Sequence, residues 1–189
     1  PYGNTKKVGE EIIRDTAKAS SINAILLRYF NPIGAHPTAE IGELPIGVPQ
    51  NLVPFITQTA IGLRQELSVF GDDSATPDGT AVLDYIHVVD LAKAHVIALE
   101  RLLEKKNTDR VETFNLGTGT GSSVLEVIQS FERVSGQKLP YKIVPRREGD
   151  VTEAYANTHK ANTVLGWKAE STLDEAMASA WKWEQKIRS

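Results

Sequence analysis

Two residues in the first turn of the chain could together move a proton. Tyr2 and Lys6 are four positions apart, a spacing at which a helix places both side chains on one face. A lysine ammonium held beside a phenol favours the phenolate form, which makes a tyrosine a better base near neutral pH. The same spacing also describes an ordinary exposed pair on a helix, so these two residues alone leave both interpretations open.

The composition limits the kinds of protein to which the chain can belong. Its 189 residues are 41% hydrophobic and 24% charged, which is enough apolar material to bury a substantial core. The net charge is only -3, and lysine and arginine occur in short pairs, so we expect no nucleic-acid partner. Cysteine is absent, which excludes thiolate zinc sites and suits a reducing compartment. No apolar run is long enough to span a membrane, so we expect a cytoplasmic protein without a membrane partner.

Helical and extended segments alternate along the sequence. Apolar spacing predicts helices over residues 4–19, 51–64, 89–104, 123–134, 159–165 and 172–187, and short apolar runs predict strands over residues 24–27, 67–70, 84–88, 113–116 and 142–144. This alternation is typical of an α/β fold. Ligands bind at the carboxyl ends of parallel strands, so the loop 29–37, in which Pro32 holds Asn31 extended, is a candidate binding segment.

The glycine-dense stretch Gly117-Thr118-Gly119-Thr120-Gly121 does not have the Gly-x-Gly-x-x-Gly spacing of a dinucleotide-binding turn. It also comes too late in the chain to open a first strand-helix-strand unit. We expect a strand-to-helix turn here, with Ser122 or Ser123 capping the helix that follows. His36 and His87 lack acidic or histidine partners at ligand spacing, so we expect no metal site.

Six short motifs, taken in order, resemble the UDP-glucose 4-epimerases of the extended short-chain dehydrogenase/reductase family. They run essentially from end to end of the chain. They are Tyr2-Gly3-x-x-Lys6, Leu27 to Pro37 (LRYFNPIGAHP), Asn51-Leu52-x-Pro54, Asp84 to Ala92 (DYIHVVDLA), Phe114 to Gly117 (FNLG) and Arg146 to Asp150 (RREGD).

The resemblance implies a fold and a division into domains. We expect the end of a doubly wound parallel Rossmann-type sheet together with a smaller α/β substrate-binding domain. Residues 1–35 would end an NAD-binding Rossmann domain, and residues 36–189 would mainly bind a nucleotide sugar, with 84–104 returning to the Rossmann domain. The sequence begins without methionine and directly on the first motif, so we expect a further segment before it in the whole protein, and no activity from these 189 residues alone.

The resemblance also implies a reaction with NAD as the cofactor. UDP-glucose and UDP-galactose would interconvert through a 4-keto sugar, with Tyr2 taking the proton from the sugar 4-hydroxyl. Lys6 would favour the phenolate and hydrogen-bond the nicotinamide ribose, and Tyr29 would help to hold the nicotinamide end. Tyr2 and Lys6 are therefore the catalytic candidates, and with Tyr29 they are the cofactor-binding candidates.

Eleven further residues would bind the UDP-sugar if the resemblance holds. They are Phe30, Asn31, Asn51, Leu52, Ser68, Val69, Phe70, Tyr85, Val124, Arg147 and Asp150. Chemistry alone favours Arg147, because a guanidinium can bind phosphate oxygens in a bidentate way that lysine cannot copy. Plain core packing is an equally good explanation for Phe70.

Two positions bear on substrate binding and specificity. Leu83 stands where the epimerases carry an arginine that contacts the diphosphate, so one charge-assisted contact worth about 1.5 to 3 kcal/mol would be missing. Ala154 falls at the position whose size decides whether an N-acetylated sugar fits. Its small side chain would admit UDP-N-acetylglucosamine as well as UDP-glucose, although Ala154 could equally serve only to begin an element of secondary structure.

Three interpretations stay open at this point. The chain is the C-terminal portion of an epimerase, with a UDP-sugar as substrate and a homodimer as one possible assembly of the whole protein. Alternatively, it belongs to another nucleotide-sugar enzyme, such as a dehydratase or decarboxylase, an idea that Leu83 supports. The third interpretation is a non-catalytic, truncated nucleotide-sugar binding module.

Overall fold

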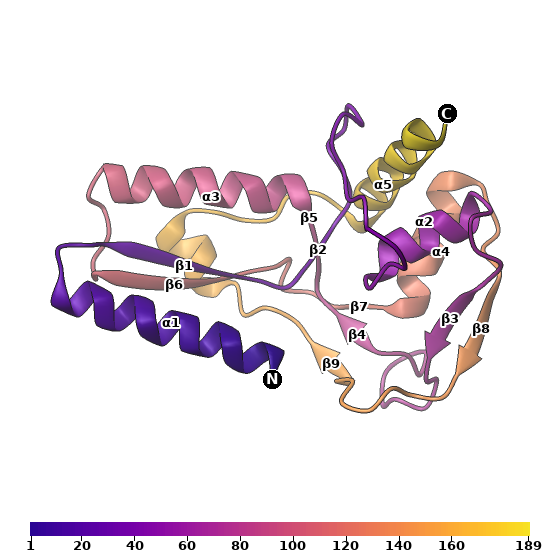
Figure 1. Cartoon of the computed structure of the whole chain (residues 1–189), viewed down its shortest axis with the longest axis horizontal. Helices are drawn as coiled ribbons and strands as arrows, with labels where there is room; N and C mark the ends of the chain where they lie inside the picture. Colours follow the sequence, from indigo (N-terminus) through magenta and orange to yellow (C-terminus); the bar gives the residue numbers. More distant parts are fainter.

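Two parallel strands form the centre of one half of the molecule in the computed structural model, which describes all of residues 1–189 (Figure 1). Strand β1 (Ala24–Tyr29) pairs with β6 (Val111–Leu116) along its whole length. Helix α1 (Tyr2–Ala19) lies on one side of this pair, and α3 (Val88–Leu103) lies on the other. A short π-helix, η1 (Ala161–Leu165), packs on β6. The arrangement is one layer of parallel strands between helices.

The core of this half follows from the alternation of side chains along β6. Glu112, Phe114 and Leu116 point inward and are buried, while the residues between them are partly exposed. These strand residues meet the apolar face of α3 and the segment around η1. The buried apolar cluster consists of Ile86, Leu91, Ala94, Ala98, Phe114, Leu116, Ala161, Leu165 and Trp167.

The other half of the molecule packs three helices beside a second parallel pair. The helices are α2 (Leu52–Ala60), α4 (Val124–Ser135) and α5 (Leu173–Arg188), and the strands are β3 (Leu67–Phe70) and β8 (Tyr141–Val144). Their cluster of buried apolar side chains includes Ile33, Val53, Ile56, Leu67, Val69, Tyr85, Val127, Ile128, Phe131, Leu139, Ala176, Met177 and Ala180. None of the helices in the molecule is both long enough and apolar enough to cross a membrane.

Five short strands join the two halves. β2 (Asn31–Ile33) runs parallel to β5 (Tyr85–His87), directly beyond the end of β1. β4 (Val82–Leu83) lies between β7 (Ser122–Ser123), which is antiparallel to it, and β9 (Glu153–Ala154), which is parallel. The junction is therefore built from segments that lie far apart in the sequence.

Side-chain caps define where several helices begin. Ser123 accepts a hydrogen bond from the Glu126 backbone N–H while the Glu126 carboxylate accepts from Ser123, and Thr172 forms the same capping box with Glu175. The prediction of a strand-to-helix turn capped by Ser122 or Ser123 is confirmed, with Ser123 as the cap. Gly136 ends α4 in the left-handed conformation (φ 68°).

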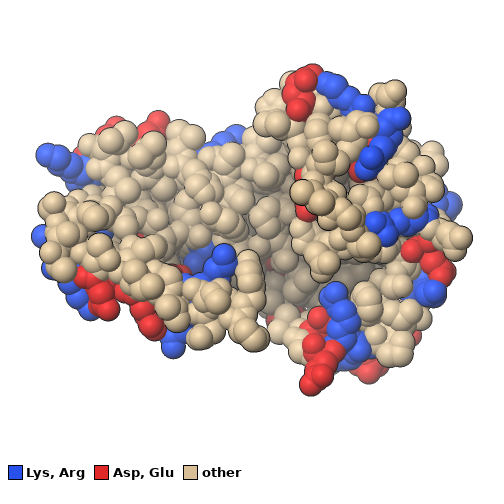
Figure 2. All heavy atoms as spheres, in the orientation of Figure 1, with Lys and Arg blue, Asp and Glu red and all other residues tan.

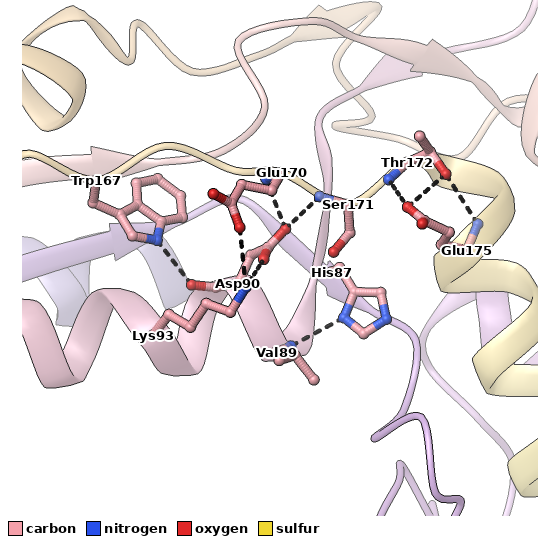
Figure 3. Close-up of polar contacts among 9 residues, drawn as sticks. All are labelled: His87, Val89, Asp90, Lys93, Trp167, Glu170, Ser171, Thr172 and Glu175. Carbon is pink, nitrogen blue, oxygen red and sulfur yellow. Dashed lines mark hydrogen bonds and ion pairs between the residues drawn. The ribbon is translucent and has the colours of Figure 1, made fainter.

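A buried carboxylate attaches the last connecting segment to the start of α3 (Figure 3). Asp90 accepts hydrogen bonds from the backbone N–H groups of Glu170 (2.9 Å) and Ser171 (2.7 Å), while its backbone carbonyl accepts from the indole of Trp167 (2.9 Å). Lys93 approaches the same carboxylate at 3.4 Å. Burial raises the pKa of Asp90, but these hydrogen bonds outweigh it and the pKa lies below the ordinary value.

Most of the predicted elements are confirmed, and the differences have local causes. The predicted helix over 51–64 ends at Ala60, because Gly62 takes a positive φ and the chain turns back onto Gln58. The predicted strand over 84–88 is shorter, Tyr85–His87, because Asp84 lies between β4 and β5 and Val88 already begins α3. The loop 29–37 contains β2, in which Asn31 is extended as predicted. The sequence does not predict the strands β2, β4, β7 and β9, because two or three residues carry no periodic signal.

The ring of His87 caps α3 and is buried against α5 (Figure 3). Its Nδ1 accepts a hydrogen bond from the backbone N–H of Val89 at 3.0 Å, so the proton of the neutral ring lies on Nε2, which faces Ser179 Oγ at 3.3 Å. Burial lowers the pKa of His87, against the opposing influence of the Asp90 and Glu175 carboxylates and with a smaller contribution from Lys93 in the same direction. Protonation would remove the cap.

The stability of the protein should depend on pH because only the neutral ring of His87 can cap α3. The folded state binds a proton at His87 less readily than the unfolded chain does. The contribution of this residue to the free energy of unfolding should therefore be complete above pH ~6.5. It should fall as the pH drops below that value, by at most about 1.4 kcal/mol per pH unit. His87→Asn keeps an acceptor near the Nδ1 position without a titrating ring, and should flatten this slope in denaturant unfolding between pH 7.5 and 5.5. His159→Asn, at an exposed histidine, is the control. Equal slopes in the wild type and in His87→Asn would contradict the assignment.

Candidate functional site

The candidate residues cluster where the two halves of the molecule meet. Tyr2 begins α1, Tyr29 ends β1, Phe70 ends β3, and Arg147 follows β8 (Figure 1). In the same orientation, the surface is hollowed between the two halves (Figure 2). The strand ends that the sequence predicted as a binding region therefore do face a recess.

The pair at the start of α1 has the predicted geometry. Residues 2 to 6 are helical, and the Lys6 ammonium lies 5.1 Å from the centre of the Tyr2 ring. Tyr2 is 76% exposed, and Lys6 forms no ion pair with any carboxylate of the chain. Both functional groups are thus free to meet a ligand, and the prediction that they share one helix face is confirmed.

Tyr29 lies at the end of β1 beside a residue that the sequence analysis did not identify. Its hydroxyl is 3.3 Å from Nε2 of His95 on α3, and the two rings are 5.5 Å apart at 52°. The other nitrogen of His95 contacts the Leu91 carbonyl at 2.9 Å. No sequence motif links residues 29 and 95, so this contact could be found only in the folded structure.

Phe30 and Asn31 continue from β1 into the junction. The backbone N–H of Phe30 donates to the Leu116 carbonyl at 3.1 Å. Asn31 donates two hydrogen bonds to the carbonyl of Asp84, one from its backbone and one from its side-chain amide, both at 3.0 Å. Asn31 is therefore held in place by the segment before β5.

A second group of candidates lies beyond the ends of β3 and β8. The Arg147 guanidinium lies over the Phe70 ring, 4.4 Å from its centre, and pairs with Asp150 at 2.9 Å. Phe70 is 40% exposed, so the alternative explanation of plain core packing is wrong for this residue. Basic and acidic side chains lie together at this end of the molecule (Figure 2), including Arg146, which pairs with Asp73 at 2.5 Å. A flat, exposed aromatic ring beside a guanidinium can stack a planar base and bind phosphate.

Several predicted binding residues turn their side chains toward the core. Val69 and Tyr85 are buried, and Leu52 and Val124 pack against the same cluster. Burial raises the pKa of the Tyr85 phenol above its ordinary value, so this hydroxyl stays neutral. These residues can offer a ligand little beyond backbone groups, whereas Ser68 lies on the opposite face of β3 and is partly exposed.

Leu83 and Ala154 lie side by side. They are directly paired in the parallel strands β4 and β9, so their side chains share one face of this small sheet. The two positions lie 71 residues apart in the sequence, and only the strand register brings them together.

The side-chain amide of Asn51 donates a hydrogen bond to the carboxylate of Glu43 at 2.7 Å. No group of three or more histidine, aspartate or glutamate side chains forms a metal-binding arrangement.

Parallel strands between helices, with a tyrosine-lysine helix at the carboxyl ends of the strands, define a Rossmann-type protein of the short-chain dehydrogenase/reductase class. The chain belongs to the family whose model is described as GDP-mannose 4,6 dehydratase, which matches residues 1–180. It is 54% identical over 187 residues to the UDP-glucose 4-epimerase of Mus musculus, covering 98% of this chain and 53% of that protein. It is 51% identical over 185 residues to the UDP-glucose 4-epimerase of Bacillus subtilis, covering 97% and 54%.

Solved structures agree with these sequence relatives. A UDP-glucose 4-epimerase from Stenotrophomonas maltophila, crystallised with NAD and formylated UDP-arabinopyranose, is 50% identical with a TM-score of 0.95, covering 100% of this chain and 55% of that one. The enzyme from Bifidobacterium longum, in complex with NAD+ and UDP, is 49% identical with a TM-score of 0.93 and the same coverage. The chain thus spans about half the length of the relatives it matches, and the predicted α/β, Rossmann-type fold is confirmed.

Proposed function

We propose that this chain is the C-terminal part of an NAD-dependent UDP-glucose 4-epimerase, which interconverts UDP-glucose and UDP-galactose through a 4-keto sugar. The observation that carries the proposal is the match of the whole chain, at a TM-score of 0.95, to an epimerase crystallised with NAD and a UDP-sugar derivative. In this proposal the hollow between the two halves receives the sugar. Residues 1–35 end the Rossmann domain, 84–104 return to it, and the rest of 36–189 mainly binds substrate.

The residues at the end of β1 fit a nicotinamide cofactor. Tyr2, Lys6 and Tyr29 are exposed there, and Lys6 has no acidic partner that would compete for its ammonium. Lys6 would donate to the ribose hydroxyls, and Tyr29 would support the nicotinamide end. NAD, when bound, supplies a reversible hydride acceptor for the sugar C4 position.

The side chains of the chain itself account for proton transfer and substrate binding. Tyr2 accepts the proton of the sugar 4-hydroxyl and later returns it, while the neighbouring ammonium of Lys6 stabilises the phenolate. Arg147 binds the diphosphate with its planar guanidinium, and Phe70 lies beneath it beside the uracil. Asp150 orients Arg147 and contacts the ribose. Asn31 and Asn51 complete the polar wall of the site.

The exposed apolar surface beside β1 supports a larger sheet in the whole enzyme. β1 has a strand neighbour only on the side of β6, so its other edge is unpaired. Large apolar side chains are exposed on both flanking helices, among them Ile12 on α1 and Leu99 on α3. An exposed strand edge is normally paired or covered, so we propose that further strands and helices of the enzyme pack here. A homodimer and a cytoplasmic location stay predictions from the sequence.

The proton-transfer role can be tested in the whole enzyme. Tyr2→Phe removes the hydroxyl that exchanges the proton, so conversion of UDP-galactose to UDP-glucose with NAD should slow by about 10²- to 10⁴-fold. Tyr141→Phe, at another exposed tyrosine on β8, is the matched control and should keep the wild-type rate. An active Tyr2→Phe enzyme would contradict the epimerase mechanism. An inactive wild type would favour a different nucleotide-sugar enzyme or a binding module.

The role of Arg147 predicts a change in affinity. Arg147→Lys keeps the charge but loses the bidentate fork and the flat contact with Phe70, so titration calorimetry with UDP should show binding weakened by about tenfold or more. Arg133→Lys, whose partner Asp174 lies on the α4 and α5 surface, should leave UDP affinity unchanged. An unchanged UDP affinity in Arg147→Lys would contradict the role of the guanidinium fork.

The position of Ala154 predicts the range of sugars. A small side chain leaves room for an acetamido group, so the enzyme should convert UDP-N-acetylglucosamine as well as UDP-glucose. Ala154→Tyr should lower kcat/KM for the N-acetylated sugar about 10- to 200-fold relative to UDP-glucose. Glu153→Tyr, on the opposite face of β9, is the control. Parallel changes for both sugars after Ala154→Tyr would refute this specificity role.

A further inference from the structure

Asp84 is a fully buried carboxylate that none of the roles above uses. Its side chain has no exposed surface and forms no ion pair with lysine or arginine. One oxygen accepts hydrogen bonds from the backbone N–H (2.8 Å) and the hydroxyl (2.7 Å) of Thr118. The other oxygen accepts from the backbone N–H groups of Gly119 (3.0 Å) and Ala156 (3.1 Å). A carboxylate without a counter-ion is thus held by four donors of the protein itself.

The main chain of Asp84 binds two predicted site segments directly. Its N–H donates to the carbonyl of Ala154 at 3.0 Å, and its carbonyl accepts both hydrogen bonds of Asn31. Side chain and main chain together join the start of β2, the turn after β6 and the segment around β9. These three segments belong to both halves of the molecule and are separated by up to 125 positions between Asn31 and Ala156.

The glycine-dense turn is shaped around this carboxylate. A Cβ atom at Gly117 would lie 2.3 Å from Asp84 Oδ2 and 2.7 Å from the Cβ of Ala156, which is closer than any real contact. Gly119 has φ +80°, a conformation that side chains disfavour and that turns its N–H toward Asp84. Successive N–H groups in such a turn form an anion-binding concavity. Here the anion is an aspartate of the same chain.

We propose that Asp84 is a positioning residue for the sugar-binding site, acting through Asn31 and Ala154. The role rests on the proposed epimerase function, because it concerns the placement of two residues of that site. The backbone of Asp84 is hydrogen-bonded to both Asn31 and Ala154, and the buried carboxylate of the same residue is fixed by its own four hydrogen bonds. A shift of this side chain therefore moves a binding residue and the specificity position together.

The test uses the whole enzyme with UDP-glucose and UDP-N-acetylglucosamine. Asp84→Asn keeps the shape but turns an amide N–H₂ toward backbone N–H donors, so at least one hydrogen bond is lost and a donor faces a donor. KM for UDP-glucose should rise about tenfold, and the ratio of kcat/KM between the two sugars should change. Gly117→Ala places a methyl group against the Asp84 carboxylate and should displace it, so this variant should show both effects as well.

A second buried carboxylate, Glu112, provides a control that distinguishes a positioning role from an effect on stability alone. Glu112 pairs with Arg101 near the start of β6, at the opposite end of the strand from the site, so Glu112→Gln should lower the melting temperature and leave KM and the sugar ratio unchanged. If Asp84→Asn lowers only the melting temperature, the positioning role is refuted. Thr118→Val removes a single hydroxyl and provides the milder variant if Asp84→Asn does not fold.

The outcome for Asp84 is distinguishable from the outcome for the proposed function. A wild-type enzyme that converts neither sugar would remove the epimerase proposal, whatever Asp84 does. In that case titration of UDP into the wild type and Thr118→Val decides the positioning role: weaker binding in the variant supports it, and equal binding overturns it.

Discussion

A carboxylate buried in a protein must receive hydrogen bonds from the protein, because the water that would otherwise solvate it has been removed. Asp84 and Asp90 both meet this requirement mainly with backbone N–H groups of segments that come later in the chain. Asp84 accepts hydrogen bonds from the turn after β6 and from the residues that follow β9. Asp90 accepts hydrogen bonds from the segment that leads to α5. Hydrogen bonds to two side chains from one short stretch of sequence therefore join segments of both halves, beside the strand pairs of the junction.

The candidate site therefore contains two kinds of residue, those fixed by backbone hydrogen bonds and those with exposed side chains. Asn31, Leu83 and Ala154 are held by strand pairing and by the backbone of Asp84. Tyr2, Lys6 and Arg147 lie at the margins with their charged or polar ends accessible. In the proposed function, the fixed residues would hold a flexible, charged substrate in place, and the accessible groups would bind it and exchange a proton with it.

The adjacency of Leu83 and Ala154 connects two specificity questions. The first position holds the apolar Leu83 and the second the small Ala154. Because the two side chains share one face of the β4 and β9 pair, a change at one alters the surroundings of the other. In the proposed function, substrate preference at this wall would depend on both residues together.

The sequence by itself determined the α/β class, most helices and longer strands, the helix face shared by Tyr2 and Lys6, and the motifs that point to the epimerases. These features depend on local periodicity and on residues close together in the chain, so they can be read without a fold. Only the tertiary structure decided that Tyr29 meets His95, that Val69 and Tyr85 face the core while Phe70 faces Arg147, and that Leu83 lies beside Ala154. Each of these depends on strand register or helix packing between distant segments. Gly117 shows the limit most clearly, because a side chain there would collide with Asp84, a residue more than thirty positions away, and no local pattern records such a contact.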